Sequence, residues 1–210
     1  MNVQAQRRSL LALLAAPALS VLPRMASAGA QMEEPLADAV RNALSAVVNG
    51  SEPPEPVFAD TEARLYYLRW KVEMNRRLVA RHSDLTTLQH RDEFLQTLWY
   101  NSKRAKLDMA LVLGLIQVES NFRQFAVSSA GARGYMQVMP FWTRSIGDGD
   151  SDKLFQMKLN LRFGCAILRH YLEQEREDPF MALGRYNGSR GRAPYPLAVQ
   201  GAREHWEFSG

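Results

Sequence analysis

The fold is decided by residues 108–122, which read DMALVLGLIQVESNF. Asp108 fits the N-cap of a helix, because its carboxylate can accept hydrogen bonds from the free backbone amides of the first turn. The following residues are apolar nearly all round, so a helix over 109–119 has to be buried on every side. It is too short to cross a bilayer. The pattern therefore predicts a central core helix whose end leaves the core through polar residues.

Glu119 closes this apolar run, and its position predicts an unusual carboxyl group. If the carboxyl lies against the core, its charged form loses hydration, and it also faces the negative end of the helix dipole. Both effects raise the pKa, and cleavage of a glycosidic bond needs a general acid that is still protonated near neutral pH. The helix alone leaves a second interpretation open, in which Glu119 is an exposed helix-end residue without a chemical role.

Amphipathic patterns on both sides of the core helix predict a mainly α-helical protein. A helix over 36–48 and a Pro-rich linker over 50–56 are followed by long helices over 60–81 and 90–106. Beyond the core helix we expect a loop or short hairpin over 126–134 and helices over 135–145, within 154–176, from 179 to 186 and from 195 to 206. No long alternating stretch supports a large sheet.

The part before the core helix is expected to contribute unequally to the core. Residues 29–59 are a poor core candidate and are expected to be loosely attached. In the helix over 60–81, a broad apolar face is predicted. This face is expected to hold Leu65, Leu68, Val72 and Val79 together with Tyr66, Tyr67 and Trp70.

The first 28 residues have the three parts of a secretory signal peptide. Arg7 and Arg8 precede an apolar stretch over 10–22, and Ala26-Ser27-Ala28 fits the small-x-small rule for cleavage. The run RRSLL over 7–11 also resembles a twin-arginine signal, so both export routes stay open. The alternative is an amphipathic first helix or an uncleaved anchor. We expect an exported, periplasmic protein with no stable membrane span after cleavage.

Charge and cysteine content limit the possible partners. The chain has 26 basic and 22 acidic residues, but cleavage would remove Arg7, Arg8 and Arg24, leaving 23 basic residues, 22 acidic residues and a net charge of +1. Such a balance gives no support for nucleic-acid binding. Cys165 is the only cysteine. It excludes an intrachain disulfide, and its apolar surroundings in sequence predict a small buried side chain.

Several motifs follow Glu119 in a fixed order. They are ESNF at 119–122, Ser128, GARGYMQVMP at 131–140, NLRFG at 160–164 and ALGRYNG at 182–188. Over about 108–208 the chain thereby resembles the soluble lytic transglycosylases, a family of the lysozyme-like superfamily. The resemblance implies a lysozyme-like catalytic domain over 108–208, preceded by the signal peptide (1–28), a linker with a short helix (29–59) and an N-terminal helical extension (60–107). Tyr135 and Arg185 depart from the family pattern.

The resemblance also implies roles for individual residues. Glu119 corresponds to the family's single catalytic acid and base. The residues implied to bind the glycan are Ser128, Gln137, Met139, Tyr186 and Asn187. Taken singly, each of these five has an ordinary structural explanation, as a turn, core or cap residue. As an ordered set behind Glu119 they favour a functional interpretation.

An ordinary glycosidase pairs two carboxylates, and no second acid occurs between Glu119 and Asp148. The resemblance implies that Glu119 protonates the leaving oxygen of a β-1,4 bond between N-acetylmuramic acid and N-acetylglucosamine. It then takes a proton from the C6 hydroxyl, which closes a 1,6-anhydro ring. Two alternatives stay open: a lysozyme-type hydrolase that uses water, and a noncatalytic peptidoglycan-binding scaffold.

No metal or organic cofactor is expected. Asp148, Asp150 and Asp152 alternate like the start of a calcium loop, but Lys153 and Leu159 stand where such a loop needs glycine and glutamate. The four histidines show no zinc spacing. The expected partner is the glycan strand of peptidoglycan. Protein partners are left open by the sequence.

Overall fold

The computed structural model describes residues 31–50, 55–81 and 84–210, so the predicted signal peptide and most of the predicted linker lie outside it. Within these ranges the chain is mainly α-helical, as predicted. The helices are α1 (Asp38–Val48), α2 (Thr61–Val79), α3 (Leu88–Arg104), α4 (Met109–Ser120), α5 (Phe141–Ile146), the 3-10 helix η1 (Ser151–Phe155), α6 (Met157–Gln174), α7 (Pro179–Asn187) and α8 (Pro194–Glu204). Two isolated bridges, Val127–Arg133 and Arg133–Val138, are the only extended pairings in the described chain.

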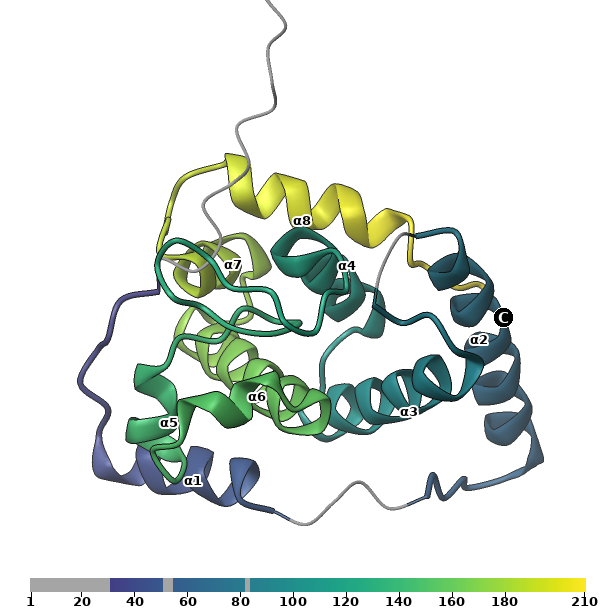
Figure 1. Cartoon of the computed structure of the whole chain (residues 1–210), viewed down its shortest axis with the longest axis horizontal. Helices are drawn as coiled ribbons and strands as arrows, with labels where there is room; N and C mark the ends of the chain where they lie inside the picture. Colours follow the sequence, from purple (N-terminus) through teal and green to yellow (C-terminus); the bar gives the residue numbers. More distant parts are fainter. Residues whose placement is uncertain (1–30, 51–54, 82–83) are drawn as a thin grey trace, which may run out of the picture.

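The core helix α4 forms as predicted. The Asp108 carboxylate accepts a hydrogen bond from the Leu111 amide at 2.9 Å, which fixes the start of the helix. Asn121 ends it in the left-handed conformation with φ of 49°, a conformation that asparagine adopts more readily than most residues. Its residues from Leu111 to Ile116 are buried on all sides, and Met109, Ala110 and Val118 are partly buried. Figure 1 shows α4 and α6 in the middle of the molecule, with α8 lying along one side of α4 and α7.

The prediction for the buried face of α2 is right for Tyr67 and Trp70 and wrong for the four aliphatic residues. Leu65, Leu68, Val72 and Val79 are exposed, Val72 to 70%. The buried residues of this helix are Tyr67, Trp70, Met74 and Leu78. These four also follow helical spacing, but they lie on nearly the opposite side of the helix from the exposed aliphatic residues, and the two aromatic side chains bury more area than branched aliphatic ones. Trp99 of α3 lies 4.8 Å from the Tyr67 ring and 5.0 Å from the Trp70 ring, so packing against α3 selects the aromatic face.

The predicted helix over 135–145 begins only at Phe141. Asn160 of α6 prevents an earlier start, because its side chain bonds the loop: its Oδ1 accepts from the Met136 amide and its Nδ2 donates to the Arg133 carbonyl, both at 2.8 Å. Gly134 permits this approach, since a Cβ there would lie 2.3 Å from the Asn160 amide nitrogen. The loop over 126–138 is therefore fastened to α6 before the next helix starts.

The N-terminal segment is closely packed, so the expectation of loose attachment is wrong for residues 31–50. Leu44 and Val48 of α1 are buried, and α1 packs against α5 and α6. Upstream of α1, the buried Gln31 accepts a hydrogen bond from the Trp142 indole at 2.8 Å. Sequence patterns missed this contact because it joins residues far apart in the chain.

We predict that Gln31→Ala lowers stability, because the buried indole N–H of Trp142 loses its acceptor. An unpaired buried donor costs about 1–3 kcal/mol, which lowers the melting temperature of a chain of this size by roughly 2–4 °C per kcal/mol. Glu33→Gln is the control, since its ion pair with Arg144 is long, at 3.7 Å, and mostly exposed. Equal melting temperatures of both variants and the parent would argue against an anchored segment.

Candidate active site

The carboxyl group of Glu119 lies in the last turn of α4 and is buried, with 6% of the residue exposed. Its Oε1 accepts a hydrogen bond of 2.5 Å from the Tyr195 hydroxyl. Its Oε2 is buried and has no hydrogen-bond partner among the described residues. Burial raises the pKa of Glu119 to about 8, although the bond from Tyr195 opposes this rise. The group is therefore mostly protonated at neutral pH and can donate a proton.

Tyr195 is a site residue that the sequence analysis missed. It stands in the first turn of α8 between Pro194 and Pro196, where it reads only as part of a helix start. Its side chain is buried, and burial raises its pKa well above the ordinary value, with the charge of Glu119 adding to the rise. The hydroxyl therefore stays protonated and donates. Only the packing of α8 on α4 brings this hydroxyl to the carboxyl, so no local pattern could have found it.

We predict that Tyr195→Phe moves the basic limb of the pH–rate profile to higher pH. Loss of the hydrogen bond removes the contact that lowers the pKa of Glu119. The maximal rate should also fall by about tenfold or more, because hydrogen bonds to charged groups contribute about 1.5–3 kcal/mol. Tyr171→Phe is the matched control, a buried tyrosine whose ring lies 6.5 Å from Tyr186. A pH–rate profile identical to that of the parent would show that Tyr195 does not influence the reaction at Glu119.

Tyr186 of α7 is bonded to the loop over 126–138 and lies within the electrostatic reach of Glu119. Its hydroxyl donates a hydrogen bond of 2.7 Å to the Met136 carbonyl. The residue is fully buried, and burial raises its pKa well above the usual value, with the charge of Glu119 as the second cause. The structure therefore brings Tyr186 and this loop together in the neighbourhood of Glu119. Asn187, the next residue, is also buried and ends α7.

Gln137 and Ser128 brace the loop itself. The Gln137 side chain is buried and its Nε2 donates to the carbonyls of Ala126 and Gly134, at 3.1 and 2.9 Å. The Ser128 hydroxyl accepts from the Ala132 amide at 3.1 Å. These bonds hold a compact loop beside the end of α4. Met139, which follows, is partly buried against the core.

Ser120 is a second residue that the sequence analysis gave no role. Its hydroxyl donates to the Tyr135 carbonyl at 2.7 Å and approaches the Ile116 carbonyl at 3.2 Å. It therefore joins the last turn of α4 directly to the loop. The motif ESNF places Ser120 beside Glu119, but only the folded loop reveals what the hydroxyl bonds.

A helical core with one buried carboxyl at the end of its central helix, facing a short bridged loop, defines a protein of the lysozyme-like class. Residues 97–209, more than half of the chain, match the family model described as the transglycosylase SLT domain. The chain belongs to this family.

Individual relatives are similar over shorter stretches. The membrane-bound lytic murein transglycosylase C of Glaesserella parasuis serovar 5 is 56% identical over 39 residues, which cover 19% of this chain and 11% of the relative. The protein of the same name from Actinobacillus pleuropneumoniae serotype 5b is 35% identical over 109 residues, covering 46% and 29%. The transglycosylase of Enterobacteria phage PRD1 is 32% identical over 101 residues, covering 48% and 37%. The chain thus matches well under half the length of each of these relatives.

Residues 31–50, 55–81 and 84–210 hold the helices that the structure describes. Not one of these helices combines the length and the apolar character that crossing a bilayer requires.

Proposed function

We propose that the protein is a peptidoglycan lytic transglycosylase that cleaves the β-1,4 bond between N-acetylmuramic acid and N-acetylglucosamine and leaves 1,6-anhydromuramic ends. One observation carries the proposal: Glu119 is buried, its pKa is raised to about 8, and no other carboxylate of the described chain contributes to that pKa. A glycosidase that relies on two enzyme carboxylates needs a second one across the bond. A single carboxyl fits a reaction in which the substrate supplies its own nucleophile.

In the first step Glu119 gives its proton to the glycosidic oxygen, and the bond from that oxygen to the anomeric carbon breaks. The departing N-acetylglucosamine leaves with a free hydroxyl. Positive charge develops on the muramic acid and is shared with its own N-acetyl group. Glu119 becomes a carboxylate, which the hydrogen bond from Tyr195 stabilises.

In the second step the Glu119 carboxylate takes the proton of the C6 hydroxyl of the same muramic acid. The C6 oxygen attacks the anomeric carbon, and the 1,6-anhydro ring closes. Glu119 is protonated again, so the cycle balances without water. Attack within one sugar has a high effective concentration, which favours ring closure over hydrolysis.

The surrounding residues are proposed to form the glycan-binding site. Tyr186 bonds the braced loop, and Ser120 joins that loop to the last turn of α4, so we propose that Tyr186 and the neighbouring residues Met139 and Asn187 contact the bound glycan. Gln137 and Ser128 are bonded within the loop, which supports a role in shaping it, and we propose that they also contact the sugar.

The cellular location of the protein and the boundaries of its domains are part of the same proposal. The signal-like first 28 residues favour export to the periplasm, where peptidoglycan lies. We propose that 108–208 form the catalytic domain and that 60–107 form an extension. Its helix α3 packs on α4 and α6, so the extension would support the catalytic domain directly.

Digestion of purified peptidoglycan followed by mass analysis of the fragments tests the proposal. We expect fragments with anhydro ends, each one water lighter than the hydrolysed form. Hydrolysed ends would instead indicate a lysozyme-type hydrolase. Absence of any fragment at several pH values would indicate a noncatalytic peptidoglycan-binding protein.

A further inference from the structure

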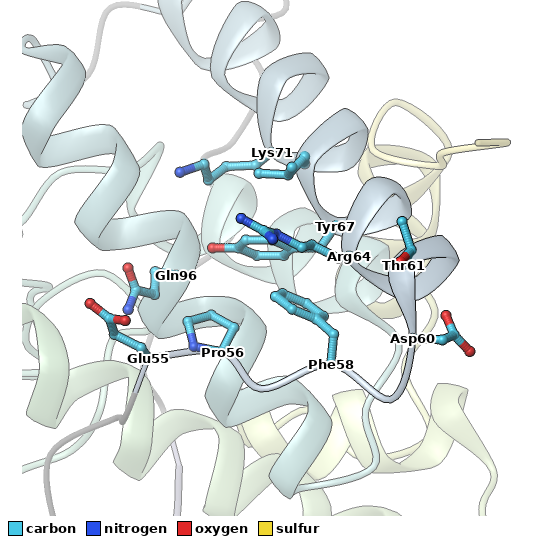
Figure 2. A pocket seen from close by; sticks show the side chains of 10 residues that line it. Glu55, Pro56, Phe58, Asp60, Thr61, Arg64, Tyr67, Lys71 and Gln96 are labelled. Atoms are coloured by element: carbon cyan, nitrogen blue, oxygen red, sulfur yellow. The ribbon is translucent and has the colours of Figure 1, made fainter.

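A pocket lies where the segment before α2 meets α2 and α3, and Figure 2 shows the side chains that line it. Its charged lining is balanced, with two acids and two bases, namely Glu55, Asp60, Arg64 and Lys71. Lys71 is already held in an ion pair, so the charges of this pocket select no class of ligand. The segment over 31–34 differs, because its side chains bond residues beside the Glu119 site.

Residues 31–34 lie against α7, and Figure 1 shows this segment, in purple, running from beside α7 to α1. The two carboxylate oxygens of Glu34 accept hydrogen bonds from Nη1 of Arg185 at 2.8 and 3.1 Å. Glu175 holds the same guanidinium through its Nε. Arg185 departs from the family pattern, and its partner Glu34 lies outside the matched residues 97–209. The departure therefore has a structural reason, since the arginine binds the N-terminal segment.

The buried side chain of Gln31 contacts two residues through the two ends of its amide. Its Oε1 accepts from the Trp142 indole at 2.8 Å. The amide also interacts with the Tyr186 hydroxyl and lowers its pKa, against the larger effect of burial. A contact that lowers this pKa comes from a donor, and Nε2 is the only donor of a glutamine side chain. Nε2 makes no hydrogen bond of ordinary geometry in the described chain, so the Tyr186 oxygen is the acceptor that it faces.

This arrangement fixes the direction of the Tyr186 hydroxyl. The hydroxyl donates to the Met136 carbonyl at 2.7 Å, and its oxygen faces the Gln31 amide. A hydroxyl rotates about its C–O bond to suit its partners, so a donor on one side and an acceptor on the other keep it pointing at the loop over 126–138. The rings are supported as well, since the Tyr171 ring lies 6.2 Å from Trp142 and 6.5 Å from Tyr186.

We propose that Gln31 is a positioning residue for Tyr186, and that the bond between Glu34 and Arg185 keeps the segment over 31–34 in place for this purpose. The inference rests on the proposed function, since Tyr186 serves the reaction at Glu119. Gln31 acts through the Tyr186 hydroxyl and through the loop that this hydroxyl bonds. The segment before α1 is thereby part of the working enzyme, although it lies outside the matched family domain.

A double-mutant cycle on the rate of glycan cleavage by the full chain tests the proposal. Gln31→Ala should lower the maximal rate by about fivefold, the effect of losing one neutral hydrogen bond. In a Tyr186→Phe background the same substitution should change the rate by less than about twofold, because the hydroxyl on which Gln31 acts is then absent. The same loss in both backgrounds would overturn the proposal, since a residue that only anchors the segment gives additive effects. All rates are measured below the melting temperature of the least stable variant.

Glu34→Gln is a second variant, chosen because it changes a partly exposed side chain and leaves the core intact. It weakens the bond to Arg185, so we expect the maximal rate to fall in the same direction, by about twofold. Glu33→Gln is the matched control in the same segment, since its ion pair with Arg144 is long, at 3.7 Å, and its rate should equal that of the parent. Equal rates for these two variants would contradict a role for the segment.

A spectroscopic measurement separates failure of this inference from failure of the proposed function. Tyrosine isotopically labelled at the ζ carbon, beside the hydroxyl, reports on the hydrogen bonds of that hydroxyl, and the Tyr186 resonance is assigned by its loss in Tyr186→Phe. We expect Gln31→Ala to shift this resonance and Glu33→Gln to leave it in place. An unchanged resonance in Gln31→Ala would overturn the contact. The products that the parent releases from peptidoglycan test the proposed function, and this shift does not depend on them.

Discussion

Replacing Glu119 with glutamine is expected to slow the release of anhydro-muropeptides from peptidoglycan by a factor of about 100 to 10,000, the usual contribution of a general acid or base. Glutamine has the same shape and can still accept the hydrogen bond from Tyr195, but it has no acidic proton to give and cannot take one back. The loss should therefore appear in the maximal rate, with binding of glycan strands retained. Full activity of this variant would refute the proposed function.

The same substitution has an expected effect on stability that serves as its folding control. In the unfolded chain Glu119 titrates near 4.5, while in the folded protein its pKa is raised to about 8. As the pH rises from 4.5 toward 8, the unfolded chain loses this proton before the folded protein does, so the parent loses stability over that window. The amide variant has no such loss.

Thermal unfolding from pH 4 to pH 8 measures this difference. The Glu119→Gln variant should match the parent near pH 4 and become progressively more stable than the parent toward pH 8. Each unit of pKa difference corresponds to about 1.4 kcal/mol, which sets an upper bound for a side chain that relaxes on ionisation. Parallel curves for the two proteins would show that Glu119 is not a buried carboxyl.

Gly114→Ala is expected to separate α8 from α4 and to reduce both stability and activity. A Cβ at this position would lie 2.7 Å from the Arg203 nitrogen and 2.9 Å from the Val199 carbonyl oxygen. These are backbone atoms of a packed helix, so α8 itself has to move. Because Tyr195 stands at the start of α8, movement of that helix would lengthen the hydrogen bond to Glu119.

Two energies oppose each other in this variant. Alanine favours the helical conformation over glycine by about 1 kcal/mol, whereas overpacking a core costs about 1–3 kcal/mol. The backbone contacts at Gly114 cannot relax by a side-chain rotation, so we expect overpacking to win. The melting temperature should fall, and the pH–rate profile should shift in the same direction as that of Tyr195→Phe.

Gly201→Ala is the matched control for this prediction. Gly201 also lies inside a helix, α8, but a Cβ there would meet no atom within 4 Å. Here only the helical preference acts, so this variant should be as stable as the parent or more stable by up to about 1 kcal/mol. A Gly114→Ala variant that behaved like Gly201→Ala would show that close packing of α8 on α4 is not needed.

The sequence by itself determined the central features of the protein. An apolar run that starts at Asp108 and ends at Glu119 can satisfy its backbone and bury its side chains only as a core helix. That run also leaves one carboxyl at the end of the helix, where burial raises the pKa. Spacing within a helix is a local property, so the positions of most helices could be predicted, and the ordered motifs indicated the family.

Tertiary structure alone decided which faces meet. Tyr195 reaches Glu119 because α8 packs on α4, Gln31 reaches Trp142 across the fold, and Asn160 fastens the loop that delays α5 until Phe141. On α2 the predicted face combined aliphatic and aromatic residues that lie on different sides of the helix, and the aromatic side is buried because Trp99 of α3 packs against it. Local periodicity gives the same signal for either face. The choice depends on the area that each face buries against a partner distant in the sequence, and this appears only when the chain is packed.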